Sequence, residues 1–288
     1  MPTIEAQGLC RLAMEKDRKA ARVRATDIRH GCGGRHLRDC RAAAQSLPGQ
    51  SRAATRPQNA AMGTLYLVRH GQASFGSDDY DRLSDMGQRQ SVQLGRYWAE
   101  RGMVFDAVIT GTLRRHQQTW AGIAEGAGLS HEPLAWAGLN EYDSEAVIRA
   151  IHPHPLQKPR NAAEAPELYR HHFRLLRDGL AQWMAGTVSP QGMPSYTEFV
   201  RGVTGALDHV RANHHGQNVL LVSSGGPIST AVGHVLGLSP EATIELNLRI
   251  RNSAVTEFQF NPKRHTLLSY NTLPHLDRAE FKDWMTYA

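Results

Sequence analysis

Cysteine is absent from most of this chain, because Cys10, Cys32 and Cys40 all lie within the first 61 residues. Residues 62–288 therefore form no disulfide and offer no thiol for catalysis. Two of the cysteines have histidines nearby, but no CxxC pair is present and the spacings match no standard zinc finger. We expect no metal site, and we interpret the three residues as loose cysteines in an irregular segment.

Long hydrophobic runs are also absent. No stretch of eighteen or more consecutive apolar residues occurs, so we expect no membrane-spanning helix and no membrane partner. The N-terminus carries charges and lacks the apolar core of a secretory signal. Together with the cysteine-free region, these absences predict a cytoplasmic protein.

The excess of positive charge is confined to the beginning of the chain. The formal net charge is +6. Residues 1–61 contain 12 Lys and Arg against 5 Asp and Glu, a net charge of +7, whereas residues 62–288 contain 21 against 22, a net charge of −1. The larger part of the chain is therefore not basic, and we expect no nucleic-acid partner.

The first 61 residues are rich in Arg and Ala and show no strand pattern. They offer little apolar surface for a core, so disorder or marginal helix is the default expectation. A targeting arm, a basic binding arm and an upstream extension outside the native protein are the alternatives, and five acidic residues count against a transit peptide. We favour a disordered tail or an upstream extension, followed by one catalytic domain over residues 62–288.

From residue 62 onward, strand-like and helix-like segments alternate. Short apolar runs predict strands at residues 65–68, 105–109, 131–136, 218–223, 254–260 and 265–270. Amphipathic segments predict helices at residues 84–100, 113–127, 196–212 and 225–236. This alternation predicts an α/β fold, a three-layer α/β/α sandwich with a mostly parallel central sheet and the last two strands at its edge. Residues 143–195 break the alternation with helical segments at 143–151 and 164–185, which we interpret as a helical insertion over the active-site end of the sheet.

The triplet Arg69-His70-Gly71 directly follows the first predicted strand. Ligands of open α/β sheets bind beyond the carboxyl ends of the strands, so the triplet lies where a site is expected. Arginine binds phosphate through a planar, permanently charged group, neutral histidine can attack phosphorus, and glycine allows the backbone a close approach. A surface Arg-His pair at a strand end is the competing interpretation, and the triplet alone does not decide between the two.

The surrounding motifs favour the phosphate site. The stretch LVRHGQA at residues 67–73 resembles the signature of the histidine phosphatase superfamily, in its phosphoglycerate-mutase-like branch. Four further segments resemble motifs of that family in order and at normal spacing: LSDMGQRQ at 83–90, TGTLRRHQQT at 110–119, LNEY at 139–142 and VLLVSSGGPI at 219–228. The resemblance covers about residues 62–260 and implies neither a metal nor a cofactor.

The resemblance also implies a role for each matching residue. His70 corresponds to the nucleophile, and Glu141 corresponds to the acid that protonates the leaving group. The expected phosphate-binding residues are Arg69, Arg115, Gly71 and Ser224. Phosphoryl transfer needs such a nucleophile, cationic donors and a proton source, so the residue types agree with the chemistry. A solvated helix arginine at 115 and an ordinary loop acid at 141 remain the alternatives.

Ser224 departs from the family pattern, which usually has a second phosphate-binding histidine at this position. A serine hydroxyl can still bind phosphate, but it carries no charge, so we expect a weakened site rather than an abolished one. We do not expect another histidine to compensate. His234 lies about two turns along its helix, and the side chain of His116 is expected to point about 100° away from that of Arg115.

Two further differences bear on the reaction. Gly76 replaces an Asn found in many members, and Ser74 and Ser77 are the residues that could take over its contact. The mutases of the family have a longer Glu-Arg-x-Tyr-Gly pattern after the acid, which the segment EYDS at residues 141–144 does not match. This difference argues against a bisphosphoglycerate-dependent mutase.

We therefore predict a phosphatase that hydrolyses a phosphomonoester through a phosphohistidine on His70. The alternative is a catalytically weak or inactive member that binds a phosphorylated ligand or a protein partner, because Ser224 replaces the second histidine. The partner is either a small phosphorylated substrate or a phosphoprotein, and the sequence does not choose between them. A homodimer is one of the assemblies that the sequence leaves open.

Overall fold

Strand β4 (Asn218–Ser223) forms the centre of the molecule because its sequence, NVLLVS, is almost entirely apolar. Its four aliphatic side chains have no exposed surface. Burial on both faces is typical of a strand in a parallel sheet that helices cover on both sides. Strand β1 (Gly63–Arg69) pairs with β4 in parallel, with Arg69 opposite Ser223. The two strands therefore end together, and the residues that follow them meet at one edge of the sheet.

The computed structural model describes residues 62–74, 81–157 and 164–287. The predicted basic segment, its cysteines, and the positions of Gly76 and Ser77 lie outside these residues. The other strands of the sheet are β2 (Ala107–Thr110), β3 (Leu134–Ala135), β5 (Val255–Asn261) and β6 (Arg264–Thr272).

The strand order across the sheet is β3-β2-β4-β1-β5-β6. The first four strands run parallel, β5 is antiparallel to β1, and β6 is antiparallel to β5. The predicted parallel-rich sheet with its last two strands at one edge is thus confirmed. Strand β3 is shorter than the predicted 131–136, because it has only β2 as a neighbour and its Leu134 remains 45% exposed.

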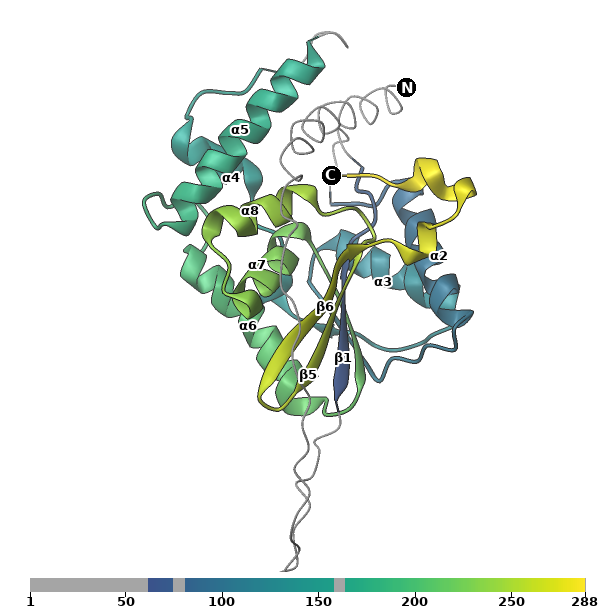
Figure 1. Cartoon of the computed structure of the whole chain (residues 1–288). Coiled ribbons are helices and arrows are strands. Elements are labelled where there is room, and N and C mark those ends of the chain that lie inside the picture. Colours follow the sequence, from purple (N-terminus) through teal and green to yellow (C-terminus); the bar gives the residue numbers. More distant parts are fainter. Residues whose placement is uncertain (1–61, 75–80, 158–163, 288) are drawn as a thin grey trace, which may run out of the picture.

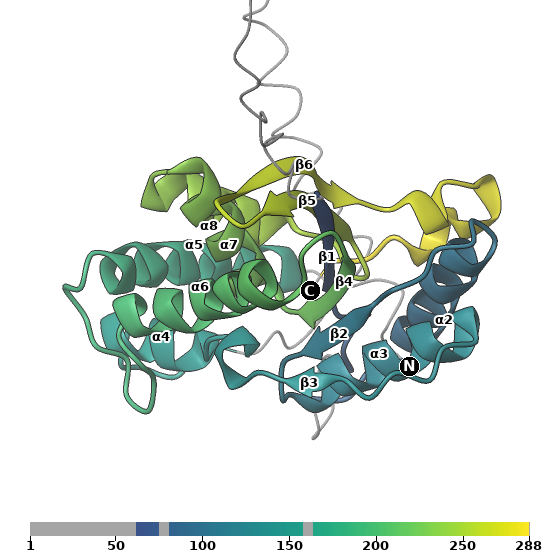
Figure 2. The same cartoon turned by 90° about the horizontal axis from the view of Figure 1, so that it is seen from below.

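Helices cover both faces of the sheet and confirm the three-layer fold. Helices α2 (Asp85–Ala99) and α3 (Arg114–Ala127) lie on one face, and α6 (Tyr196–Asn213) and α7 (Gly225–Leu236) lie on the other (Figures 1 and 2). Side chains alternate along the strands accordingly. Val68 and Val222 pack with α2 and α3, whereas Leu67 and Leu221 pack with α6 and α7.

The predicted insertion contains helices α4 (Ser144–Ile151) and α5 (Ala165–Met184), on the same side of the sheet as α6 and α7 (Figure 2). Trp183 of α5 is buried in the core together with Val147 of α4. The structure adds α8 (Pro240–Arg249), which the sequence did not predict. Arg177 on α5 forms an ion pair of 2.8 Å with Glu245 on α8, so the insertion contacts this additional helix.

None of the described helices combines the length and the apolar character that a membrane crossing requires.

A cavity in the central strand is expected to destabilise the fold strongly. Leu221→Ala removes a fully buried side chain from β4 and should lower the free energy of unfolding by about 2–5 kcal/mol. Leu268→Ala on β6 is the matched control, because that side chain is 51% exposed and its loss should cost less than about 0.5 kcal/mol. Urea unfolding monitored by circular dichroism measures both. Equal losses for the two variants would contradict the assignment of β4 to the core.

Candidate active site

His70 is the first residue after β1, and both its backbone N–H and its carbonyl form hydrogen bonds. Its N–H donates to the carbonyl of Ser223 at 2.9 Å, and its carbonyl accepts from the N–H of Ser253 at 3.1 Å. The side chain is buried. The last residue of β4 and a residue shortly before β5 therefore fix the position from which the imidazole projects.

The ring of His70 is oriented by one of its own nitrogens. Nδ1 lies 2.7 Å from the carbonyl oxygen of Gly71. Since a carbonyl only accepts, Nδ1 carries the proton and Nε2 keeps its lone pair. Burial lowers the pKa of His70 well below its usual range, and the charges of Arg69 and Arg115 lower it further. The imidazole is therefore neutral, with a nucleophilic nitrogen at Nε2.

Two buried guanidinium groups lie beside this ring. Arg69 is the last residue of β1, and its Nη1 donates to the carbonyl of Ile250 at 2.5 Å. Arg115 lies in the first turn of α3. Both positive charges lower the pKa of His70 and oppose the rise of the pKa of Glu141. The structure thus brings four of the predicted residues into one site.

Asp81 holds one of these arginines in place. Its Oδ1 accepts from Nη1 of Arg115 at 2.8 Å, and its Oδ2 accepts from the backbone N–H of Arg114 at 2.9 Å. One carboxylate thus binds both the start of α3 and the guanidinium that projects from it. Sequence reasoning missed Asp81, because no motif contains it and its only signal is a position shortly before the segment LSDMGQRQ.

Glu141 follows the short 3₁₀ turn Ala137–Leu139 and lies against the start of α7. Both of its carboxylate oxygens accept from the backbone N–H of Gly226, at 3.1 and 3.2 Å. Burial raises the pKa of Glu141, and the hydrogen bond from Gly226 and the charges of Arg115 and Arg69 oppose that rise. A Cβ atom on Gly226 would lie 2.2 Å from Oε1 of Glu141, so this contact requires glycine.

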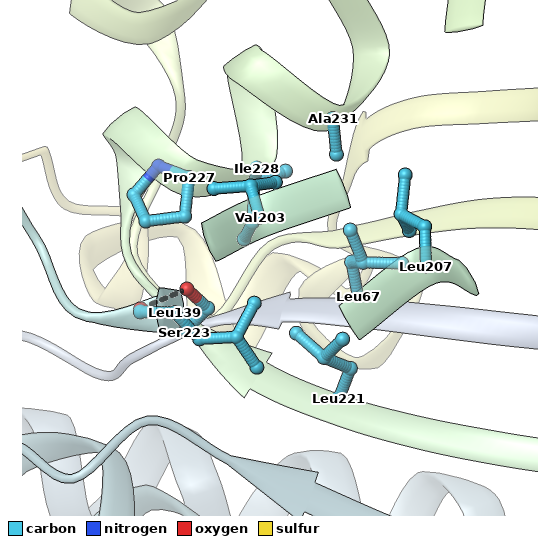
Figure 3. A pocket seen from close by; sticks show the side chains of 9 residues that line it. All are labelled: Leu67, Leu139, Val203, Leu207, Leu221, Ser223, Pro227, Ile228 and Ala231. Atoms are coloured by element: carbon cyan, nitrogen blue, oxygen red, sulfur yellow. Dashed lines mark hydrogen bonds between the residues drawn. The ribbon is translucent and has the colours of Figure 1, made fainter. Parts of the chain in front are cut away.

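Ser223 anchors the segment that carries Glu141. Its hydroxyl donates to the carbonyl of Leu139 at 2.6 Å. Apolar side chains, among them those of Leu67 and Ile228, surround this hydrogen bond (Figure 3). A buried hydroxyl needs such a partner, and this one ties the 3₁₀ turn to the end of β4. The segment that carries Glu141 is therefore hydrogen-bonded to the end of β4, the strand that leads into Ser224.

Ser224 and His116 form a buried pair. Ser224 is fully buried before α7, and its Oγ lies 2.7 Å from Nε2 of His116. The ring centroids of His116 and His70 are 5.8 Å apart. The expectation that His116 points away from the site is therefore wrong. The end of α3 faces the site, so consecutive residues of its first turn both border it. His234 is exposed on α7.

Gly71 makes its close contact with helix α2. A Cβ atom on Gly71 would lie 2.4 Å from the carbonyl oxygen of Gly87, and one on Gly87 would lie 2.1 Å from the carbonyl oxygen of Gln72. The N–H of Gly71 donates to Oγ1 of Thr119 at 3.0 Å. Close backbone packing between helix and loop thus requires both glycines. Binding of phosphate by Gly71 stays a prediction.

Among the described residues, no group of three or more His, Cys, Asp or Glu side chains is arranged to hold a metal ion.

This chain is similar in sequence to proteins of known families. Residues 65–273 match the model of the histidine phosphatase superfamily (branch 1). The chain is 31% identical to a broad-specificity phosphatase of Saccharomyces cerevisiae over 85 residues, which cover 27% of this chain and only 36% of that relative. It is 27% identical to a 2,3-bisphosphoglycerate-dependent phosphoglycerate mutase of Nitratidesulfovibrio vulgaris over 214 residues, which cover 65% of this chain and 83% of the mutase.

A solved structure shares the fold. Mycobacterial hydrolase 1 superposes with a TM-score of 0.53 at 21% identity, covering 73% of this chain and 99% of that protein. The family model spans most of the chain and includes most of β1, the motif after it and the last two strands. The chain therefore belongs to branch 1 of the histidine phosphatase superfamily.

Proposed function

We propose that the protein is a phosphatase that hydrolyses phosphomonoesters through a phosphohistidine on Nε2 of His70. The observation that carries the proposal is the neutral imidazole with its proton fixed on Nδ1 by Gly71, buried beside Arg69 and Arg115. A nucleophilic nitrogen between cationic donors is what phosphoryl transfer requires.

In the first step, Nε2 of His70 attacks phosphorus and the bond from phosphorus to the ester oxygen breaks. Arg69 and Arg115 bind the phosphate oxygens and stabilise their charge. Protonated Glu141 gives its proton to the departing oxygen, so the alcohol leaves as a neutral molecule. The raised pKa of Glu141 favours this protonated form, and a bound phosphate would raise that pKa further.

In the second step, the carboxylate of Glu141 takes a proton from water while the water oxygen attacks phosphorus. The bond from phosphorus to Nε2 breaks, and inorganic phosphate leaves. His70 returns to its neutral form and Glu141 is protonated again. The cycle closes without a metal or a cofactor.

Two observations favour water, and not a second alcohol, as the acceptor of the phosphoryl group from His70. The segment EYDS after the acid differs from the mutase pattern, and the yeast relative is a broad-specificity phosphatase. The Nitratidesulfovibrio relative is a mutase, so transfer to an alcohol is the reaction against which hydrolysis must be tested.

Incubation with a panel of phosphomonoesters tests the proposal. The panel contains p-nitrophenyl phosphate, sugar phosphates, 3-phosphoglycerate and a phosphoserine peptide, and a molybdate assay measures the inorganic phosphate released. We expect release from at least one ester and no conversion of 3-phosphoglycerate to its 2-isomer with added 2,3-bisphosphoglycerate. Isomerisation without release would identify a mutase. Ester binding without either reaction would identify a binding protein.

A further inference from the structure

The place of His116 in helix α3 does not by itself explain why its side chain is buried. Its side chain has no exposed surface, although a histidine in the first turn of a helix can easily reach water. Space for the ring exists only because residue 111 is glycine, since a Cβ atom there would lie 2.2 Å from Nδ1 of His116. Burying a polar ring beside the charge of Arg115 costs free energy, so the pairing with Ser224 needs an explanation.

The hydrogen-bond pattern identifies the proton on this ring. Burial, and then the charge of Arg115, lower the pKa of His116 to about 3, so the ring is neutral. Among the described residues, Nδ1 has no hydrogen-bond partner. A buried N–H without a partner is rarer than a buried acceptor without one, so Nδ1 is the unprotonated nitrogen. The proton lies on Nε2, which donates to Oγ of Ser224 over 2.7 Å.

This donation leaves the hydroxyl proton of Ser224 for another acceptor. The hydroxyl does not cap helix α7. Ser224 follows β4 just as His70 follows β1, and the two strands run parallel with Arg69 opposite Ser223. The hydroxyl therefore lies at the same end of the sheet as His70, where ligands of such sheets bind.

We propose that His116 is a positioning residue that directs the Ser224 hydroxyl toward a phosphate oxygen of the ligand. This inference rests on the proposed function, in which a phosphate group lies at Nε2 of His70. The two residues, from α3 and from the end of β4, then supply jointly a phosphate hydrogen bond at the position where the family usually has one histidine.

Variants of both residues test the pair. We expect His116→Ala and Ser224→Ala each to lower kcat/KM for p-nitrophenyl phosphate by about 10- to 100-fold, and to weaken orthovanadate binding by a similar factor. The double variant should be no worse than either single one, because both act through the same hydrogen bond. His116→Gln should recover most of the activity, since its amide N–H can replace Nε2–H.

Ser229→Ala is the matched control. Ser229 is a buried serine within α7, whose hydroxyl donates to the carbonyl of Gly225 at 2.6 Å, and this variant should keep full activity. Thermal unfolding of every variant separates loss of fold from loss of the pair. Unchanged kcat/KM and vanadate affinity in His116→Ala, additive losses in the double variant, or failure of His116→Gln to recover activity would each overturn the proposal.

The binding measurement separates this proposal from the proposed function. If wild type releases no phosphate but binds orthovanadate, the phosphatase proposal fails. The vanadate affinities of the same variants then still test whether His116 and Ser224 act as a pair. If wild type releases phosphate and the pair variants match it, the pair proposal alone fails. If wild type neither releases phosphate nor binds vanadate, both are overturned.

Discussion

Replacing His70 with asparagine is expected to lower phosphate release by about 10⁴-fold or more while leaving the fold intact. The amide nitrogen of asparagine occupies the place of Nδ1, so it keeps the hydrogen bond to the carbonyl of Gly71. No atom then occupies the place of Nε2, and the phosphohistidine cannot form. Initial rates with p-nitrophenyl phosphate and the thermal midpoint of unfolding measure the two effects separately.

The matched control for this variant is His265→Ala. His265 lies on β6 opposite Phe260, and Phe260 in turn lies opposite Gly63 at the start of β1, so it is at the far end of the sheet from His70. This variant should keep full activity. An active His70→Asn variant would show that another residue is the nucleophile.

Replacing Glu141 with glutamine is expected to lower the hydrolysis of alkyl phosphates by about 10²- to 10⁴-fold. Glutamine has nearly the same size and can still accept from the N–H of Gly226, but it has no acidic proton to give. Hydrolysis of p-nitrophenyl phosphate should fall much less, because p-nitrophenolate leaves without protonation. The ratio of the two losses is the measurement, and equal losses would argue against Glu141 as the acid.

The pH profile gives a second readout for the same residue. The pKa of His70 is lowered, so its nucleophile stays neutral into mildly acidic solution. The pKa of Glu141 is raised, and the acid is active only below that pKa. We therefore expect kcat/KM for alkyl phosphates to fall as the pH rises through the pKa of Glu141. This alkaline loss should vanish in Glu141→Gln, and its persistence there would assign it to another group.

Local sequence signals predicted much of the fold. The apolar run at 218–223 matches β4 in full, and the helix predicted from residue 84 is α2, which Ser84 caps by accepting from the N–H of Gly87 at 3.1 Å. Such features depend on a few neighbouring residues, so a single sequence reveals them. Helix α8 had a comparable signal, because Ser239 accepts from the N–H of Ala242 and Pro240 follows it, but its apolar residues at 242, 244, 246 and 248 alternate with polar ones and do not show a helical spacing.

Contacts within the site were harder to predict when they join residues that are far apart in the sequence. The motifs indicated His70, Arg115 and Glu141, whose side chains the structure brings together. Helical geometry alone suggested that His116 points elsewhere, since 100° separates consecutive residues along a helix. That reasoning holds for the side of a helix. It fails at the end of α3, which is directed at the site, and the direction of a helix axis is a tertiary property.

The position of β1 between β4 and β5 also determines when the protein can acquire its site. Residues near 65 pair with residues near 220 on one side and near 258 on the other. A ribosome therefore delivers β1 and His70 well before either of the strands that pair with β1. Pairings between such distant segments are slow to form, because a long loop must close before any contact compensates for its entropy. The site therefore cannot form until both β4 and β5 have been synthesised and have paired with β1 in the sheet.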